Sequence, residues 1–159
     1  MNFYNTTHLH YCGIDLHARS LYVCIIDHEG KTLLHKEIPA NPEPLYQLIE
    51  PYRDDLIMGV ECMHCWYWVA DFCEDHGIHF ILGHALYMKA IHGGKTKNDR
   101  IDSYKIAKLM RGGNFPLAYE RCGPHEIYCG NGHVLSATGL ILKHISLTRR
   151  ANTTDHRIK

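Results

Sequence analysis

Hydrophobic residues recur along the chain from about residue 11 to residue 110 in two patterns. Short apolar runs rich in β-branched and aromatic residues predict strands, and apolar residues three or four positions apart predict helices. Strands are predicted at residues 11–16, 21–26, 32–38, 56–60 and 78–82. Helices are predicted at residues 42–52, 66–75, 85–91 and 99–110. The order βββ-α-β-α-β-α indicates an α/β domain that begins with a three-stranded meander.

Composition restricts the class of protein without identifying it. A length of 159 residues suits one compact domain, and 45% hydrophobic with 21% charged residues is typical of a globular protein. The formal net charge is zero, so any nucleic-acid site must come from local clustering of charge. No apolar run approaches the roughly 20 residues that a membrane span needs. Because the polar first ten residues also lack an apolar signal core, we expect a cytoplasmic protein with no membrane partner.

The seven cysteines are odd in number and irregular in spacing, which argues against a disulfide framework. Cys12, Cys24 and Cys73 stand among apolar neighbours, as buried free thiols do. Cys62 and Cys65 have a metal-like spacing, but a structural zinc site needs four ligands, usually two such pairs. A packing role is therefore favoured, and a structural Cys/His metal site remains a weaker alternative.

Four acidic residues form a candidate metal site. Asp15 and Glu61 each close an apolar strand, and ligand sites in open sheets collect at strand ends. Asp99 and Asp102 are three residues apart and share one helix face, although favourable placement at a helix start explains such a pair equally well. Four converging carboxylates would repel one another, and a divalent cation would compensate them. Two Mg²⁺ ions held in this way can clamp the attacking and leaving oxygens of a phosphodiester.

Basic residues surround the Asp99/Asp102 pair. They are Lys89, Lys95, Lys97, Arg100, Lys105, Lys108 and Arg111. Such a bias usually marks a solvated helix face, but beside a metal-binding acid pair it also suits contacts with a phosphate backbone. We expect Lys95, Lys97 and Arg100 to bind nucleic acid.

Three segments together resemble the DEDD transposases of the insertion-sequence-110 family, a group that includes the pilin-gene invertases. The segments are Gly13–His17, Val60-Glu61 followed by Trp66-Tyr67-Trp68, and Lys95–Asp102. The resemblance covers about residues 10–119 and implies a ribonuclease-H-like (RuvC-like) mixed sheet related to that of the Holliday-junction resolvases. It also implies that Asp15, Glu61, Asp99 and Asp102 are catalytic ligands of Mg²⁺ or Mn²⁺.

The resemblance further implies DNA transposition and site-specific recombination. The implied partners are DNA, a structured guide RNA and further copies in a homo-oligomer. Family members are about twice as long, and their second domain carries a serine nucleophile. Ser103 and Ser136 lie outside any matching motif, so no serine is assigned. We expect a truncated chain that is inactive alone, which leaves its status as an enzyme open. The alternative is a non-catalytic fragment that binds nucleic acid or dimerises.

Residues 120–159 depart from the family. Its members continue with a helical stretch close to Met-Arg-Ser-Thr-Arg-Asp-Leu-Leu-Arg, whereas this chain has Cys122–Gly130. Codons permitted for that peptide, read from one nucleotide earlier, give Met, Arg, two small residues, Arg, Asp or Asn, Leu or Ile, Leu and Arg. The same shift over Lys143–Thr153 restores a second family-like pattern. We therefore expect a domain at residues 10–119 and a frameshifted, poorly ordered tail; a divergent native tail is the alternative.

Overall fold

A computed structural model describes residues 2–62, 65–92, 99–121, 127–129 and 133–135. The chain divides into two compact units, Met1–Tyr119 and Glu120–Lys159. In the first unit, each predicted strand and helix is present within a few residues of its expected bounds.

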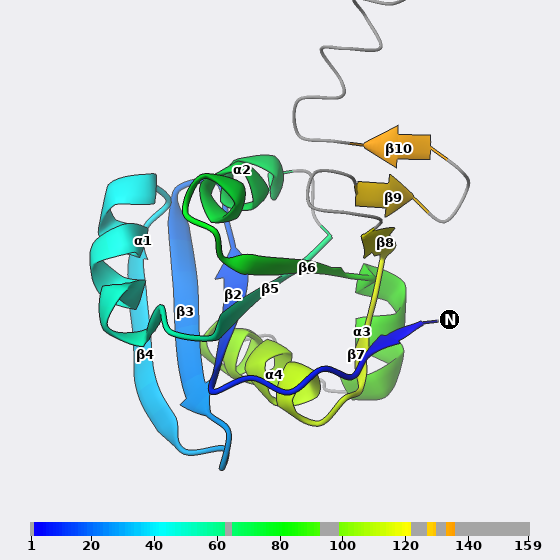
Figure 1. The fold of residues 1–159 in the computed structure, drawn as a ribbon, viewed down its shortest axis with the longest axis horizontal. Helices are drawn as coiled ribbons and strands as arrows, with labels where there is room; N and C mark the ends of the chain where they lie inside the picture. Colours follow the sequence, from blue (N-terminus) through cyan, green and yellow to red (C-terminus); the bar gives the residue numbers. More distant parts are fainter. Residues whose placement is uncertain (1, 63–64, 93–98, 122–126, 130–132, 136–159) are drawn as a thin grey trace, which may run out of the picture. The chain divides into compact units, whose positions relative to one another are not determined.

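A five-stranded sheet in the order β4-β3-β2-β5-β6 forms the centre of the first unit (Figure 1). The strands are β2 (His10–Leu16), β3 (Ser20–Asp27), β4 (Thr32–Pro39), β5 (Leu56–Glu61) and β6 (His79–Gly83). The first three form an antiparallel meander, whereas β5 runs parallel to β2 and β6 runs parallel to β5. This mixed sheet, with an antiparallel half and a parallel half, confirms the ribonuclease-H-like fold class.

Two helical connections cover one face of the sheet. α1 (Pro42–Ile49) begins after Asn41, whose side chain accepts a hydrogen bond from the Glu43 amide, and the short helix η1 (Glu50–Tyr52) extends it. α2 (Tyr67–Asp75) ends before Gly77, which has a φ of +65°. α1 links β4 to β5, and α2 links β5 to β6. Each connection joins two parallel strands, and each moves from the β4 edge of the sheet toward the β6 edge. Such crossovers are right-handed, so both helices lie on the same face of the sheet.

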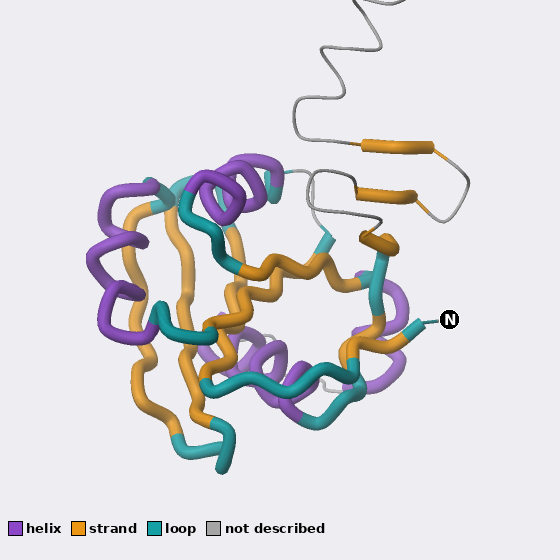
Figure 2. Tube along the Cα trace, in the orientation of Figure 1, coloured by secondary structure: helices purple, strands orange, loops and turns teal. Residues whose placement is uncertain are grey.

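α4 (Asp99–Arg111) packs on the opposite face, where α3 (Ala85–His92) also contributes Met88 to the buried cluster (Figure 2). Gly13 and Gly59 are register partners on β2 and β5 beneath α4. A Cβ atom at Gly13 would lie 2.2 Å from the Ser103 carbonyl oxygen, and one at Gly59 would lie 2.4 Å from the Met110 sulfur. Gly13 therefore lets the backbone of α4 approach the sheet closely, and Gly59 leaves room for the Met110 side chain.

A short ribbon that the sequence did not predict completes the first unit. β1 (Phe3–Tyr4) pairs antiparallel with β7 (Phe115–Pro116). In the segment that connects β1 to β2, the His8 side chain lies 2.5 Å from the Asp55 carboxylate. The Leu9 amide donates to the same carboxylate over 2.9 Å. The ribbon escaped prediction because two-residue strands are too short to show a period of two.

Three further short strands, β8 (Tyr119–Arg121), β9 (Ile127–Cys129) and β10 (His133–Leu135), form a sheet in the order β10-β9-β8. The sequence pattern did not predict them either. None of the helices among the described residues has the length and hydrophobicity needed to span a lipid bilayer.

Candidate metal centre

Asp15 and Glu61 occupy matching positions on neighbouring parallel strands. Ile14 pairs with Val60, so the next residue on each strand is one of the two acids. Side chains alternate between the faces of a strand, and Gly13 and Gly59 both face α4. Asp15 and Glu61, two residues further on, therefore lie on the α4 side of the sheet at the carboxyl ends of β2 and β5.

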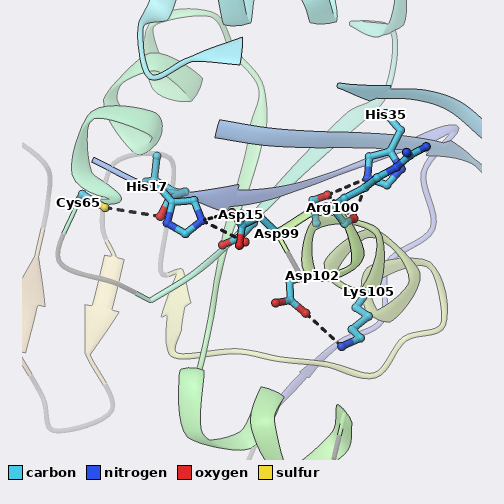
Figure 3. A network of polar contacts seen from close by, with 10 residues as sticks. Asp15, His17, His35, Cys65, Asp99, Arg100, Asp102 and Lys105 are labelled. Atoms are coloured by element: carbon cyan, nitrogen blue, oxygen red, sulfur yellow. Dashed lines mark hydrogen bonds and ion pairs between the residues drawn. The ribbon is translucent and has the colours of Figure 1, made fainter. Parts of the chain in front are cut away.

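The first turn of α4 brings a second pair of acids toward the same end of β2. Asp99 and Asp102 both lie in this turn. Ligand atoms of Asp15, Asp99 and His17 all lie within 4.8 Å of one another, an arrangement that could hold a metal ion. The Asp102 carboxylate accepts a hydrogen bond from Lys105 Nζ over 3.1 Å (Figure 3). Asp102 is close enough for its charge to act on Asp15.

His17 is a member of this cluster that sequence reasoning placed in a turn and did not assign to the site. Its Nε2 atom lies 3.4 Å from Asp15 Oδ2 and 3.3 Å from Asp99 Oδ2. That atom is shielded from solvent, although the His17 side chain as a whole is 40% exposed. The signal was present in the sequence, because residues two apart in extended chain point to the same side. The extended segment ends one residue before His17, however, so the pattern gave it little weight.

The surroundings of Asp15 disfavour its charged form. Its side chain is only 16% exposed. This burial is the largest cause of the raised pKa of Asp15, His17 opposes the shift, and the negative charges of Asp99 and Asp102 add to it. A carboxylate held in this state would be stabilised by a bound cation.

His35 on β4 holds the first turn of α4 in place. Its Nε2 donates to the Arg100 carbonyl over 2.7 Å and lies 3.1 Å from Ser103 Oγ, which itself donates to the same carbonyl. Burial lowers the pKa of His35, which favours the neutral imidazole that can make this contact. His35 thus helps to fix the helix turn that carries Asp99, and sequence reasoning missed this role.

Of the three basic residues predicted to contact nucleic acid, Arg100 is among the described residues. Arg100 is exposed on the first turn of α4, next to Asp99. Lys95 and Lys97 lie within residues 93–98, outside the described residues.

The cysteines behave largely as the sequence suggested. Cys12, Cys24 and Cys73 are buried free thiols, as predicted. Cys62 and Cys65 are half-buried, and the Cys65 thiol contacts the Leu16 carbonyl at 4.0 Å. Across the described part of the chain, the group able to hold a metal contains no cysteine.

The model of the DEDD transposases of insertion sequence 110, described as a transposase, matches residues 12–121. The chain belongs to this transposase family. The match contains all four predicted acids, and the family resemblance inferred from the sequence is thereby confirmed. No curated protein matches the chain. Among solved structures, the catalytic core domain of BIV integrase aligns over 91% of this chain and 99% of its own, with 14% identity and a TM-score of 0.33.

Proposed function

We propose that residues 12–121 form the metal-dependent catalytic domain of a DNA transposase. Asp15, Glu61, Asp99 and Asp102 would hold Mg²⁺ or Mn²⁺. The observation that carries the proposal is the approach of Asp99 to Asp15 across the α4–β2 contact, in a chain of a transposase family. When bound, the cation would polarise a phosphodiester and stabilise the charge that develops on its oxygens.

The donor set fits this type of ion. Mg²⁺ and Mn²⁺ prefer carboxylate oxygens, and all four proposed acids supply them. The pKa of Asp15 is raised mainly by burial, and the negative charges of Asp99 and Asp102 add to the shift, so a bound cation would stabilise its charged form. The acids are carried by β2, β5 and α4, and sites on rigid elements hold their geometry better than sites on loops. Lys105, bonded to Asp102, would hold that carboxylate in position before the cation arrives.

DNA is the proposed partner, and its phosphates would be bound beside the acids. Arg100 is exposed one residue after Asp99, so its guanidinium could reach a phosphate next to the cation. Lys95 and Lys97 are proposed to extend the same contact. A structured guide RNA and assembly into a homo-oligomer belong to the proposal through the family resemblance alone.

We infer that this chain does not complete strand exchange alone. The family nucleophile is a serine, and Ser103 is fully buried with its hydroxyl donating to the Arg100 carbonyl. A serine in that setting cannot attack a phosphodiester in solvent. We also propose that residues from about 120 onward are read out of frame, in keeping with a family match that stops at residue 121.

Metal titration of the full chain tests the site. We expect Asp15→Asn and Asp99→Asn to weaken Mn²⁺ binding, measured by calorimetry, by at least the roughly 10–100-fold seen when metal-site partners are removed. Asp71→Asn is the matched control, because Asp71 lies on α2, against the opposite face of the sheet. Unchanged Mn²⁺ affinity in Asp15→Asn would refute the proposal. A DNA affinity that is the same with and without Mn²⁺ would instead favour a non-catalytic nucleic-acid-binding fragment.

A further inference from the structure

The imidazole of His17 points its Nε2 atom toward the neighbouring Asp15 and Asp99 carboxylates, where the cation is proposed to bind (Figure 3). We infer that His17 Nε2 is a direct ligand of the cation, together with Asp15 and Asp99, and that this nitrogen gives the site a preference for Mn²⁺ over Mg²⁺. The inference rests on the proposed function, because it concerns the same cation.

The distances fit ligands that share an ion better than partners in a hydrogen bond. The separations of 3.3 and 3.4 Å from Nε2 to the two carboxylate oxygens exceed the usual N–H···O range of about 2.7–3.2 Å. An octahedral ion with ligands at about 2.1 Å places adjacent donor atoms about 3.0 Å apart and opposite ones about 4.2 Å apart. All three ligand atoms lie within 4.8 Å of one another, so a small contraction would bring them onto one ion.

The direction of the ring supports the same role. Although the His17 side chain is 40% exposed, its Nε2 atom is shielded from solvent and faces the two carboxylates at ion-pair distance. A cation shared by the three groups would replace these long contacts with direct metal–ligand bonds. The backbone that carries the ring is fixed, since the His17 amide donates to the Ser20 carbonyl over 2.9 Å. The ring is thus presented to the carboxylates from a closed turn at the end of β2.

The chemistry of the donors then decides which ion is favoured. Mg²⁺ binds oxygen ligands almost exclusively, whereas first-row transition metals accept imidazole nitrogen. A site with two or more carboxylates and one imidazole therefore discriminates in favour of Mn²⁺. Without His17, the remaining carboxylates would bind both ions through oxygen, and the discrimination would be reduced.

Electron paramagnetic resonance of Mn²⁺ bound to the full chain tests this directly. We expect a nitrogen coupling from a coordinated imidazole, whose pattern changes when the histidines carry the heavier nitrogen isotope. His17→Gln should abolish the coupling and weaken Mn²⁺ binding about tenfold or more, with a smaller loss for Mg²⁺. His28→Gln is the matched control, because His28 is exposed in the turn that follows β3.

The outcomes separate this inference from the proposed function. Mn²⁺ that binds the wild type and is lost in Asp15→Asn, but shows no nitrogen coupling, would overturn the role of His17 and leave the carboxylate site standing. It would mean that His17 only compensates the two carboxylates by charge. Mn²⁺ binding that is absent, or indifferent to Asp15→Asn, would overturn both. If His17→Gln does not fold, a wild-type spectrum without nitrogen coupling still overturns the role of His17, and His17→Asn repeats the assignment of a coupling that is seen.

Discussion

The ionised form of Asp15 would favour metal binding, but it reduces the stability of the metal-free fold. Burial raises the pKa of its carboxyl group, His17 opposes the shift, and Asp99 and Asp102 add to it. The folded state therefore holds a proton on Asp15 more tightly than the unfolded state does. Ionisation above this raised pKa destabilises the fold, and the penalty is absent below the unfolded value of about 3.8.

We therefore expect Asp15→Asn to stabilise the metal-free protein at neutral pH, because asparagine cannot ionise. The gain in urea midpoint, measured with a chelator present, should shrink as the pH falls toward the unfolded pKa of aspartate. Saturating Mn²⁺ should reverse the order, since ligand at 100 times its Kd stabilises the wild type by about 2.7 kcal/mol. Asp71→Asn keeps all the proposed ligands, so saturating Mn²⁺ should stabilise it as much as it stabilises the wild type. A metal-free Asp15→Asn that is less stable than the wild type would contradict the electrostatic argument.

Gly13 and Gly59 meet α4 in different ways, and this difference is testable. A Cβ atom at Gly13 would meet two backbone atoms of α4, Ser103 O at 2.2 Å and Ala107 N at 2.5 Å. At Gly59 it would meet the Met110 sulfur, near the end of a flexible side chain. We expect Gly13→Ala to lower the free energy of unfolding by about 3 kcal/mol, at the upper end of overpacking costs, and Gly59→Ala by about 1 kcal/mol. Equal losses in urea denaturation would show that α4 shifts as a body.

At the level of elements, α4 combines most of what the proposed function needs. Its first turn carries Asp99, Arg100 and Asp102, and its inner face packs on β2 and β5. A shift of the helix along the sheet would therefore move Asp99, Asp102 and the guanidinium of Arg100 together relative to Asp15. His35 opposes such a shift through its bond to the Arg100 carbonyl.

Removing the guanidinium from this turn should weaken DNA binding. We expect Arg100→Ala to weaken binding to DNA duplexes of unrelated sequence by about the same factor for each duplex. The slope of log K against log salt should fall by about 1, as it does when one phosphate contact is lost. Fluorescence anisotropy at several salt concentrations measures both quantities. Arg53→Ala is the control, since Arg53 is exposed but bonded to Tyr46 and the His76 carbonyl. An unchanged slope for Arg100→Ala would exclude the contact.

The sequence predicted the elements well where their pattern spans five residues or more. The strands of the central sheet and the helices α1 to α4 all show it, and their order led to the correct fold class. It could not reveal the β1–β7 ribbon, because its pairing joins two-residue segments from distant parts of the chain. His17 was missed for a related reason. Its importance depends on where α4 places Asp99, and that distance is set by the contact at Gly13.

At the scale of the whole chain, the boundary between the two units is open to a direct test. The first unit ends at Tyr119, close to the position from which we propose a frameshift. We expect limited proteolysis of the full chain to leave a resistant fragment that ends between about residues 112 and 125, because out-of-frame sequence is not selected for a buried core. Mass spectrometry identifies the end of the fragment. A resistant product that extends well beyond residue 125 would favour a native tail.

The partners of the N-terminal strands come late in the chain, since β1 pairs with β7 and β2 packs against α4. The first unit therefore cannot be completed until nearly all of it has been synthesised. A nascent chain that has emerged only as far as β6 has its full central sheet, but α4 and β7 are still inside the ribosome. Its inner apolar residues, including Tyr11, Cys24 and Ile57, then have no helix α4 to cover them. Such a state exposes hydrophobic surface and invites chaperones. It also has Asp15 without Asp99, so the proposed metal centre cannot be complete until translation has almost finished the unit.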